Sequence, residues 1–476
     1  MDEKNEPDLS SRDADSGERT EAETIDLQAE RKIVRKMDLN LISVFGMLYL
    51  FSFLDRSNIG NANLTGFSKD LGLVGNQYGA AVIRNIRTIR TILERYAQNS
   101  DPEAPNDGVM YSLVSADDRH SLRYKLQSGV RVLLGAAEAA IIPCVFMYIT
   151  MAYNRDEYAV RHTYVFAFSA ISGAFGGLLA FGLTRVQTAG LHGWQWLYLV
   201  EGIISICLAP ITFIWLPNSV SEARWLKQTE KDILAKRLAR NRGAYDEKER
   251  FSWSELRRCL KDPKVYIQAV SHFGIDTTLY ALTTFMPRII AGLGFTTTIN
   301  AQLLTVPVYA IAAISYLIIG WLSDRTKLRS PFLIGVLCSC LIGYIILAVP
   351  STSVGARYFA VFMVAIGIYA STSLNLVWAS CNHAGYFKRA LATGVIQLVG
   401  NSAGAAIGFI FKAQDAPRYL EGMHFAIGMT LMSICLTAIN MLIVIRTNRQ
   451  KRKLIAEGAP DDPSLADRNP HFLLYL

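Results

Sequence analysis

The sequence predicts an all-α polytopic membrane protein, and three observations lead to that fold class. The 476 residues are 51% hydrophobic and only 18% charged, with a mean hydropathy of +0.23. Soluble globular chains carry about 25% charged residues, and disordered chains lack this apolar mass. The hydrophobic residues are gathered into long runs, and the basic residues lie in short segments between the runs. This pattern is typical of a chain that crosses a bilayer many times as helices.

Ten apolar segments have about the 20 residues that a helix needs to span a bilayer. They are 38–55, 129–151, 163–184, 195–217, 265–287, 301–322, 331–349, 356–378, 390–411 and 423–445. The connections between them are short except at 77–128 and 218–264. Because four spans precede the loop at 218–264 and six follow it, the sequence predicts two helical bundles of unequal size.

The basic residues predict the orientation in the membrane. Clusters of Lys and Arg occur at 31–36, 224–240, 325–329, 388–389 and 446–453. All of them fall on one side if both ends of the chain are cytoplasmic, as the positive-inside rule requires. The predicted order is a disordered cytoplasmic tail at 1–37, an N-terminal bundle at 38–217, a basic cytoplasmic loop at 218–264, a C-terminal six-helix bundle at 265–447 and a cytoplasmic tail at 448–476. This arrangement accounts for the net charge of +8, so we expect no nucleic-acid partner.

The stretch at 77–128 is too polar to span a bilayer. Arg84, Arg87 and Arg90 recur at every third position, and a polar run follows at 98–109. Each charged side chain at the bilayer centre costs several kcal/mol. One interpretation is an amphipathic helix at 81–97 that lies in the membrane interface. The other, which we prefer, is a segment that is not native coding sequence, such as a frameshifted exon or a retained intron.

Six motifs in the same order resemble those of a known family. They read KMDLNLISVFGMLYLFSFLDRSNIGNA at 36–62, RVLLGAAEAAIIP at 131–143, GWQWLYLVEG at 193–202, PRIIAGLGFTTTINAQLLTVP at 287–307, KRALATGVIQLVGNSAG at 388–404 and APRYLEG at 416–422. The chain resembles fungal transporters of the major facilitator superfamily, within the anion:cation symporter group of allantoate, nicotinate and pantothenate permeases. The resemblance covers roughly 35–76 and 129–447.

The resemblance implies the major facilitator fold, with two six-helix bundles and twelve spans. Ten spans are recognisable here, because the polar stretch at 77–128 replaces the second and third family helices. The cytoplasmic gate motif between those two helices is therefore absent. Its C-terminal counterpart is present as GWLSDRTKLRS at 320–330, and Gln195 stands where family members usually have Arg.

Two charged residues of the fourth family helix are candidates for the substrate and the coupling ion. Arg131 and Glu138 are seven residues apart, on one face of a helix. An Arg side chain binds both oxygens of a carboxylate, so Arg131 is a candidate substrate ligand. Burial and a changing Arg partner would shift the pKa of Glu138, so Glu138 is a candidate for proton coupling. The alternative is a structural ion pair.

Amides within the C-terminal spans are further candidates for substrate binding. Asn375, Gln397 and Asn401 could hydrogen-bond a carboxylate or amide substrate, or could join helices to one another. His272 could titrate, although a single histidine in a span is more often a packed hydrogen-bonding residue.

Two pairs of charged residues are candidates for gating. Asp324 and Arg325 fit a cytoplasmic gate, where a carboxylate at a helix N-terminus or beside a partner Arg would hold one state closed. Asp55 and Arg56 end the first span at the outer surface and could act as an outer gate, a substrate contact or an interfacial pair.

The function that these residues and the resemblance predict is proton-coupled symport of a small organic anion by alternating access. An intramembrane enzyme is not expected, because no HExxH-type, Asp-rich or His-rich motif occurs. The alternative is a truncated or non-transporting paralogue of the family. The dispersed Cys and His residues predict neither a metal site nor a cofactor. We expect a monomer in the lipid bilayer of the plasma membrane, with a small organic anion and a proton as its partners.

Overall fold

The computed structural model describes residues 28–64, 145, 148–149, 152–153, 157–183, 186, 192–217, 220–240, 253–293, 298–349, 352–384, 386–411, 415, 418–461 and 463–476. The stretch at 77–128 and most of the span predicted at 129–151 lie outside these residues. The count of ten spans and the replacement of two family helices therefore stay predictions.

The regular secondary structure of the described residues is helical, with no strand among them. The helices are α2 Ser43–Leu64, α8 Tyr158–Leu183, α9 Gly193–Trp215, α10 Gln228–Arg240, α11 Trp253–Leu260, α12 Pro263–Ala291, α13 Thr298–Thr326, α14 Ser330–Ala348, α15 Val354–Asn382, α16 Tyr386–Asn401, α17 Ala403–Ile410 and α18 Leu420–Ala456. A five-residue π-helical segment, Asp38–Ile42, leads into α2, and 3₁₀ turns occur at Val220–Glu222 and Pro463–Arg468. The prediction of an all-α fold is confirmed for this part of the chain.

Seven helices of the described ranges are long and apolar enough to cross a membrane. They are Gln28–Leu54, Val160–Leu183, Gly193–Trp215, Ala301–Thr326, Ser330–Ala348, Val354–Asn382 and Leu420–Ala456. Three helices within the predicted spans are not in this group: α12 has 29 residues but many polar side chains, α16 has 16 residues and α17 has 8. The span predicted at 390–411 is divided, because α16 ends at Asn401 and α17 begins at Ala403.

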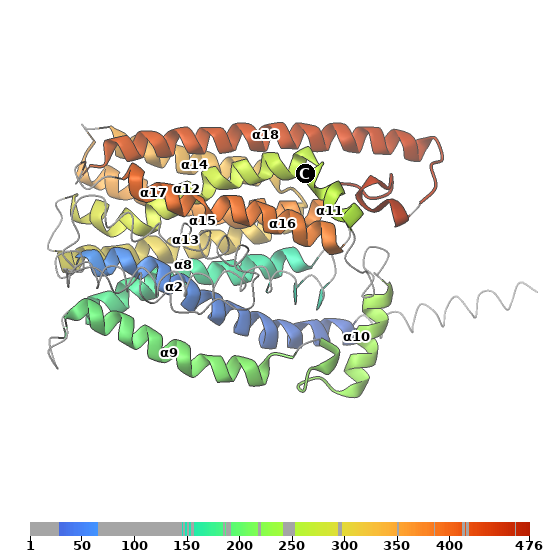
Figure 1. Ribbon diagram of the computed structural model, residues 1–476, viewed down its shortest axis with the longest axis horizontal. Helices are drawn as coiled ribbons and strands as arrows, with labels where there is room; N and C mark the ends of the chain where they lie inside the picture. The colour runs from blue at the N-terminus through green and yellow to red at the C-terminus, as the bar shows by residue number, and fades with distance from the viewer. Residues whose placement is uncertain are drawn as a thin grey trace, which may run out of the picture.

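The long helices lie side by side, with α18 along one edge of the bundle and α9 along the other (Figure 1). We call one end of this bundle the basic end. It holds α10, α11, the α13–α14 connection and the residues after α18, all at the right of Figure 1. In the middle, α8 packs closely against α13. A Cβ on Gly173 would lie 2.5 Å from the ring of Tyr309, so only glycine permits this approach.

The central loop predicted at 218–264 contains two helices. In α10, Arg237 pairs with Glu157 just before α8, and its Nε atom lies 3.5 Å from Glu30. Glu230 at the start of α10 pairs with Lys36 at 2.8 Å. These ion pairs fasten α10 to the basic ends of the helices that contain residues 28–64 and 158–183.

Beyond α18, residues 457–476 fold back onto the basic end of the C-terminal helices; we call them the tail segment. The Asn382 side chain donates to Tyr475 O at 3.0 Å and accepts from Tyr475 N at 2.7 Å. Asn448 of α18 forms the same paired bonds with Leu474, at 2.8 and 2.9 Å. Trp378 Nε1 also donates to Tyr475 O, at 2.9 Å. The tail segment thus joins α15 to α18.

Two buried lysines complete the attachment of the tail segment. Lys451 donates from Nζ to three backbone oxygens, those of Asp467 at 2.6 Å, Asn469 at 3.0 Å and Phe472 at 2.7 Å. Lys388 bridges Asp467 at 2.7 Å and Asp262, the N-cap of α12, at 2.9 Å. Burial opposes the charge on Lys388, but the two carboxylates outweigh burial and raise its pKa above the usual value.

Candidate functional site

Four buried polar side chains from α12, α15 and α16 meet inside the C-terminal bundle. We call His272, Asp276, Asn375 and Gln397 the polar cluster. His272 Nε2 lies 2.9 Å from Gln397 Oε1, and His272 Nδ1 lies 3.2 Å from Asn375 Nδ2. Asp276 Oδ2 is 3.6 Å from His272 Nε2. All four residues are at most 8% exposed, so they are shielded from water, and His272 hydrogen-bonds to both Asn375 and Gln397.

The helical repeat and one glycine place the polar cluster. His272 and Asp276 are one turn apart on α12, so they share a face of that helix. Gly400 of α16 packs on that face, where a Cβ would lie 2.5 Å from His272 Cδ2 and 2.6 Å from Asp276 Oδ2. The absence of a side chain at Gly400 lets α16 approach closely enough for Gln397 to reach His272.

A second polar contact lies one turn further along α12. Tyr280 donates from its hydroxyl to Asn401 Oδ1 at 2.8 Å. On the other side of the polar cluster, Asn375 Nδ2 also lies 3.4 Å from the backbone oxygen of Gln268. A continuous line of polar contacts therefore runs along α12 from Gln268 to Tyr280.

The structure brings the three predicted amides, Asn375, Gln397 and Asn401, against one face of α12. Whether they bind substrate or join helices stays a prediction. The predicted substrate ligand Arg131 and the predicted coupling residue Glu138 lie outside the described residues. The side chains of Asp55 and Arg56, near the end of α2, are also outside the described part of the chain.

The two predicted residues of the C-terminal gate have different surroundings. Asp324 pairs with Arg329, the N-cap residue of α14, and Arg329 also donates to Ser323 Oγ at 3.1 Å. Arg325 instead lies over the ring of Trp321, 5.3 Å from its centroid. Asp324 thus has the partner Arg at a helix N-terminus that a gate needs, and the gating role of both residues stays a prediction.

Sequence reasoning missed Asp276. A carboxylate inside the span predicted at 265–287 was itself a signal, because ionisable residues within spans are rare and mark functional sites. The histidine four residues before it strengthens that signal. The sequence of a single helix does not show that the amides of α15 and α16 converge on His272 and Asp276.

An aromatic cluster lies where the helices before and after the central loop meet. We define it as Tyr49 and Phe53 of α2, Phe166 of α8, Tyr309 of α13 and Tyr369 of α15. The ring centroids of Tyr49 and Phe166 are 5.0 Å apart, those of Phe53 and Tyr369 are 6.4 Å apart, and those of Tyr309 and Tyr369 are 6.0 Å apart. Near the end of the bundle opposite the basic end, Gln302 of α13 donates to Asn61 O of α2 at 3.4 Å.

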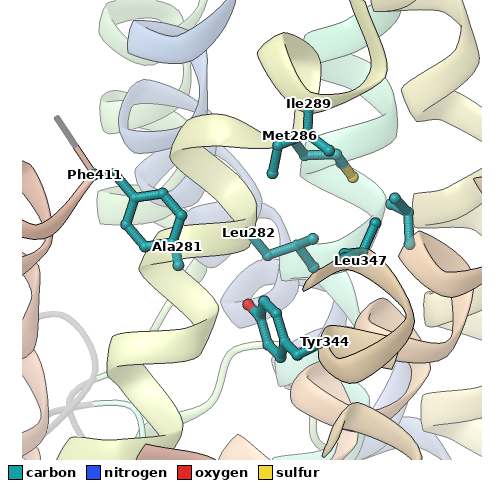
Figure 2. A pocket seen from close by; sticks show the side chains of 8 residues that line it. Ala281, Leu282, Met286, Ile289, Tyr344, Leu347 and Phe411 are labelled. Carbon is teal, nitrogen blue, oxygen red and sulfur yellow. The ribbon is translucent and has the colours of Figure 1, made fainter. Parts of the chain in front are cut away.

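A small apolar cavity near the end opposite the basic end is not a substrate site. Its volume is about 10 Å³, which holds at most one water molecule. Figure 2 shows Ala281, Leu282, Met286, Leu347 and other side chains around it. The polar group of this wall, the Tyr344 hydroxyl, already donates to Thr278 O at 3.0 Å.

Comparison with known proteins gives consistent matches over most of the chain. The sequence profile of the Major Facilitator Superfamily matches residues 124–409. A high-affinity nicotinic acid transporter of Saccharomyces cerevisiae is 37% identical over 462 residues, which cover 93% of this chain and 84% of that protein. An uncharacterized transporter of Schizosaccharomyces pombe is 35% identical over 470 residues, which cover 98% of this chain and 93% of that protein.

A solved structure has the same fold. It is a bacterial homologue of the human lysosomal transporter Spinster, in an inward-facing and occupied conformation. The TM-score is 0.53, and the alignment covers 84% of this chain and 95% of that chain at 14% identity. At this identity the likeness concerns the fold alone.

Proposed function

Because this chain belongs to the Major Facilitator Superfamily, we propose that it is a proton-coupled symporter of a small organic anion. Its relatives and its fold are those of membrane transporters and not of enzymes. In this mechanism the two bundles rock around a central site, which opens alternately to the two sides of the membrane. We propose a plasma-membrane monomer with both ends of the chain in the cytoplasm.

The observation that carries the proposal is the polar cluster inside the C-terminal bundle. Polar and ionisable groups within membrane helices are costly, and they mark substrate and ion pathways. Here a histidine and a carboxylate 3.6 Å apart are surrounded by amides. This set of groups is suited to holding a proton, while Arg131 of the other bundle would supply the positive charge for a carboxylate.

The proposed substrate class is a carboxylate such as nicotinate, allantoate or pantothenate. The 37% identity to a nicotinic acid transporter supports nicotinate as the first compound to test. The aromatic cluster supports the same choice, because Tyr and Phe rings stack on a planar heterocycle. Replacing Tyr369 by Leu would then raise the KM for nicotinate more than the KM for pantothenate, which is not aromatic.

The test is uptake of radiolabelled carboxylates by cells that express the chain and lack their own carriers. We expect nicotinate uptake that rises as the external pH falls. Arg131→Ala would abolish uptake, Arg131→Lys would leave part of it, and Glu138→Gln would remove its pH dependence. If the wild-type chain reaches the membrane but takes up none of the three carboxylates, the non-transporting paralogue becomes the better account.

A further inference from the structure

The contacts of His272 determine which of its nitrogens carries the proton. The amide nitrogen of Asn375 has hydrogens and no free lone pair, so it must donate to His272 Nδ1. The side-chain oxygen of Gln397 can only accept, so it must take the hydrogen of His272 Nε2. These contacts fit an imidazole ring that has its hydrogen on Nε2 and a lone pair on Nδ1.

The side chains around His272 also include a hydrogen-bond acceptor for a second proton on the ring. The side-chain oxygen of Asn375, Oδ1, is buried and accepts no hydrogen bond from the described residues. Turning the Asn375 amide over exchanges its nitrogen and oxygen, so Oδ1 would accept from a protonated Nδ1. Asn375 can therefore donate to Nδ1 when Nδ1 has no proton and, after turning over, accept from Nδ1 when it has one.

Asp276 supplies the counter-charge that a buried imidazolium needs. A buried charge is strongly unfavourable unless it is paired and hydrogen-bonded. The carboxylate of Asp276 lies 3.6 Å from Nε2 on the same face of α12, and both residues are nearly completely buried. Two opposite charges at this separation stabilise each other most in a region of low dielectric constant.

The groups around this pair are otherwise neutral where the structure describes them. On α12 itself Tyr280 donates to Asn401 of α16, and on α14 the hydroxyl of Tyr344 donates to the backbone of α12. From α18, Ser433 exchanges hydrogen bonds with Ser271. The balance of charge at the polar cluster is therefore set by His272 and Asp276.

We propose that His272, with Asp276 as its counter-ion and Asn375 as the amide that turns over, is a second proton-binding site of the transporter, in series with Glu138, so that coupling needs both. The proposal rests on the proposed function and gives the C-terminal bundle a role in coupling. When His272 is neutral, the ionised Asp276 leaves one negative charge in the bundle. Proton binding at Nδ1 brings that charge to zero and removes a repulsion against a carboxylate substrate. Because coupling free energies are reciprocal, the bound anion in turn favours the bound proton.

The experiment uses the purified full-length chain in liposomes, with radiolabelled nicotinate as the probe. Counterflow exchange reports alternating access without a proton gradient, and accumulation with an acidic exterior reports proton coupling. We expect His272→Gln to lose gradient-driven accumulation at least tenfold and to make the remaining counterflow independent of pH, because the negative charge of Asp276 can then no longer be balanced by a proton on residue 272. The matched control is His424→Gln, because His424 is an exposed histidine of α18. This control would behave as wild type.

Asp276→Asn is the second variant and keeps the proposal testable if His272→Gln does not fold. Without the negative charge of Asp276, the unprotonated site no longer repels a carboxylate, so accumulation should lose most of its dependence on the external pH. Wild-type accumulation in His272→Gln, or an unchanged pH profile in a folded Asp276→Asn, would overturn the proposal and leave the symporter function standing. Absence of both counterflow and accumulation in the wild-type chain would overturn the symporter function and, with it, this inference.

Discussion

Replacing Asn448 by Ala should release the tail segment from the basic end without unfolding the helices. The Asn448 side chain donates to Leu474 O at 2.8 Å and accepts from Leu474 N at 2.9 Å, and Asn448 is only 9% exposed. A hydrogen bond of this kind contributes about 1 kcal/mol net. Two lost bonds therefore weaken the docking of the tail segment by about 2 kcal/mol.

Hydrogen–deuterium exchange of the purified protein measures this loss directly. Backbone amides of a docked segment exchange through local opening, whose free energy sets the exchange rate. Because each 1.4 kcal/mol is a factor of ten in an equilibrium, we expect the Leu474 and Tyr475 amides to exchange about 30-fold faster in Asn448→Ala. Asn382→Ala removes the equivalent pair of bonds to Tyr475 and should have a similar effect.

Thr447→Ala is the matched control for the tail segment. The Thr447 hydroxyl donates to Ile443 O within α18, so its loss should leave exchange in the tail segment unchanged. If the amides of residues 472–476 exchange equally fast in the wild type and in Asn448→Ala, the paired bonds do not hold the tail segment and the reasoning fails.

Three further substitutions test other contacts of the bundle. Gly400→Ala places a Cβ 2.6 Å from Asp276 Oδ2, so it should separate α16 from α12 and lower the apparent melting temperature by several degrees. Asp324→Asn removes the charge opposite Arg329 and should increase labelling of cysteines introduced at the basic end, whereas unchanged labelling would argue against a gate. Lys388→Met removes the lysine that pairs with Asp467 and one of the two lysines that pair with Asp262, a change that costs at most about 3–5 kcal/mol. Because the pKa of Lys388 is raised, its contribution is fully present below the usual value of about 10.5 and is lost only as the pH rises through the raised value. The stability difference between wild type and Lys388→Met should therefore stay constant from pH 6 to 9 in thermal unfolding.

The helices of the C-terminal bundle could be predicted from the sequence because apolar runs of the right length have few other stable forms in a membrane. The end of the last helix could not be predicted from the sequence. It was predicted at residue 445, but α18 continues to Ala456 because Lys451 and Asn448 bind the tail segment. These contacts join positions up to 26 residues apart, and no local pattern contains them.

The division of the span predicted at 390–411 has a similar origin. Its mean hydropathy suits one continuous helix, yet α16 ends at Asn401, whose side chain is bonded to Tyr280 of α12. Small residues at 400–404 allow the chain to change direction there while it stays close to α12. Mean hydropathy depends only on the residues of one segment, so it carries no information on a contact with a neighbouring helix.

The polar cluster was only partly predictable for the same physical reason. Asn375, Gln397 and Asn401 were identified as polar residues within apolar helices, which is a property of each helix alone. Their convergence on His272 and Asp276 depends on the packing of α12 against α15 and α16. Asp276 was overlooked although it satisfied the criterion that singled out Arg131 and Glu138, an ionisable residue inside a predicted span.

Neither α12 nor α16 is among the helices long and apolar enough to cross a membrane, and both contribute side chains to the polar cluster. Replacing a buried charged pair by apolar residues of similar volume is often neutral or stabilising, so packing alone does not call for His272 and Asp276. Neutral polar side chains would also join α12 to α16 at a lower cost, as Tyr280 and Asn401 already do. The feature that a histidine and a carboxylate add is a change of net charge by one unit when a single proton binds. The proposed anion symporter would use that change inside its moving bundle, which would give the polar face of α12 a function.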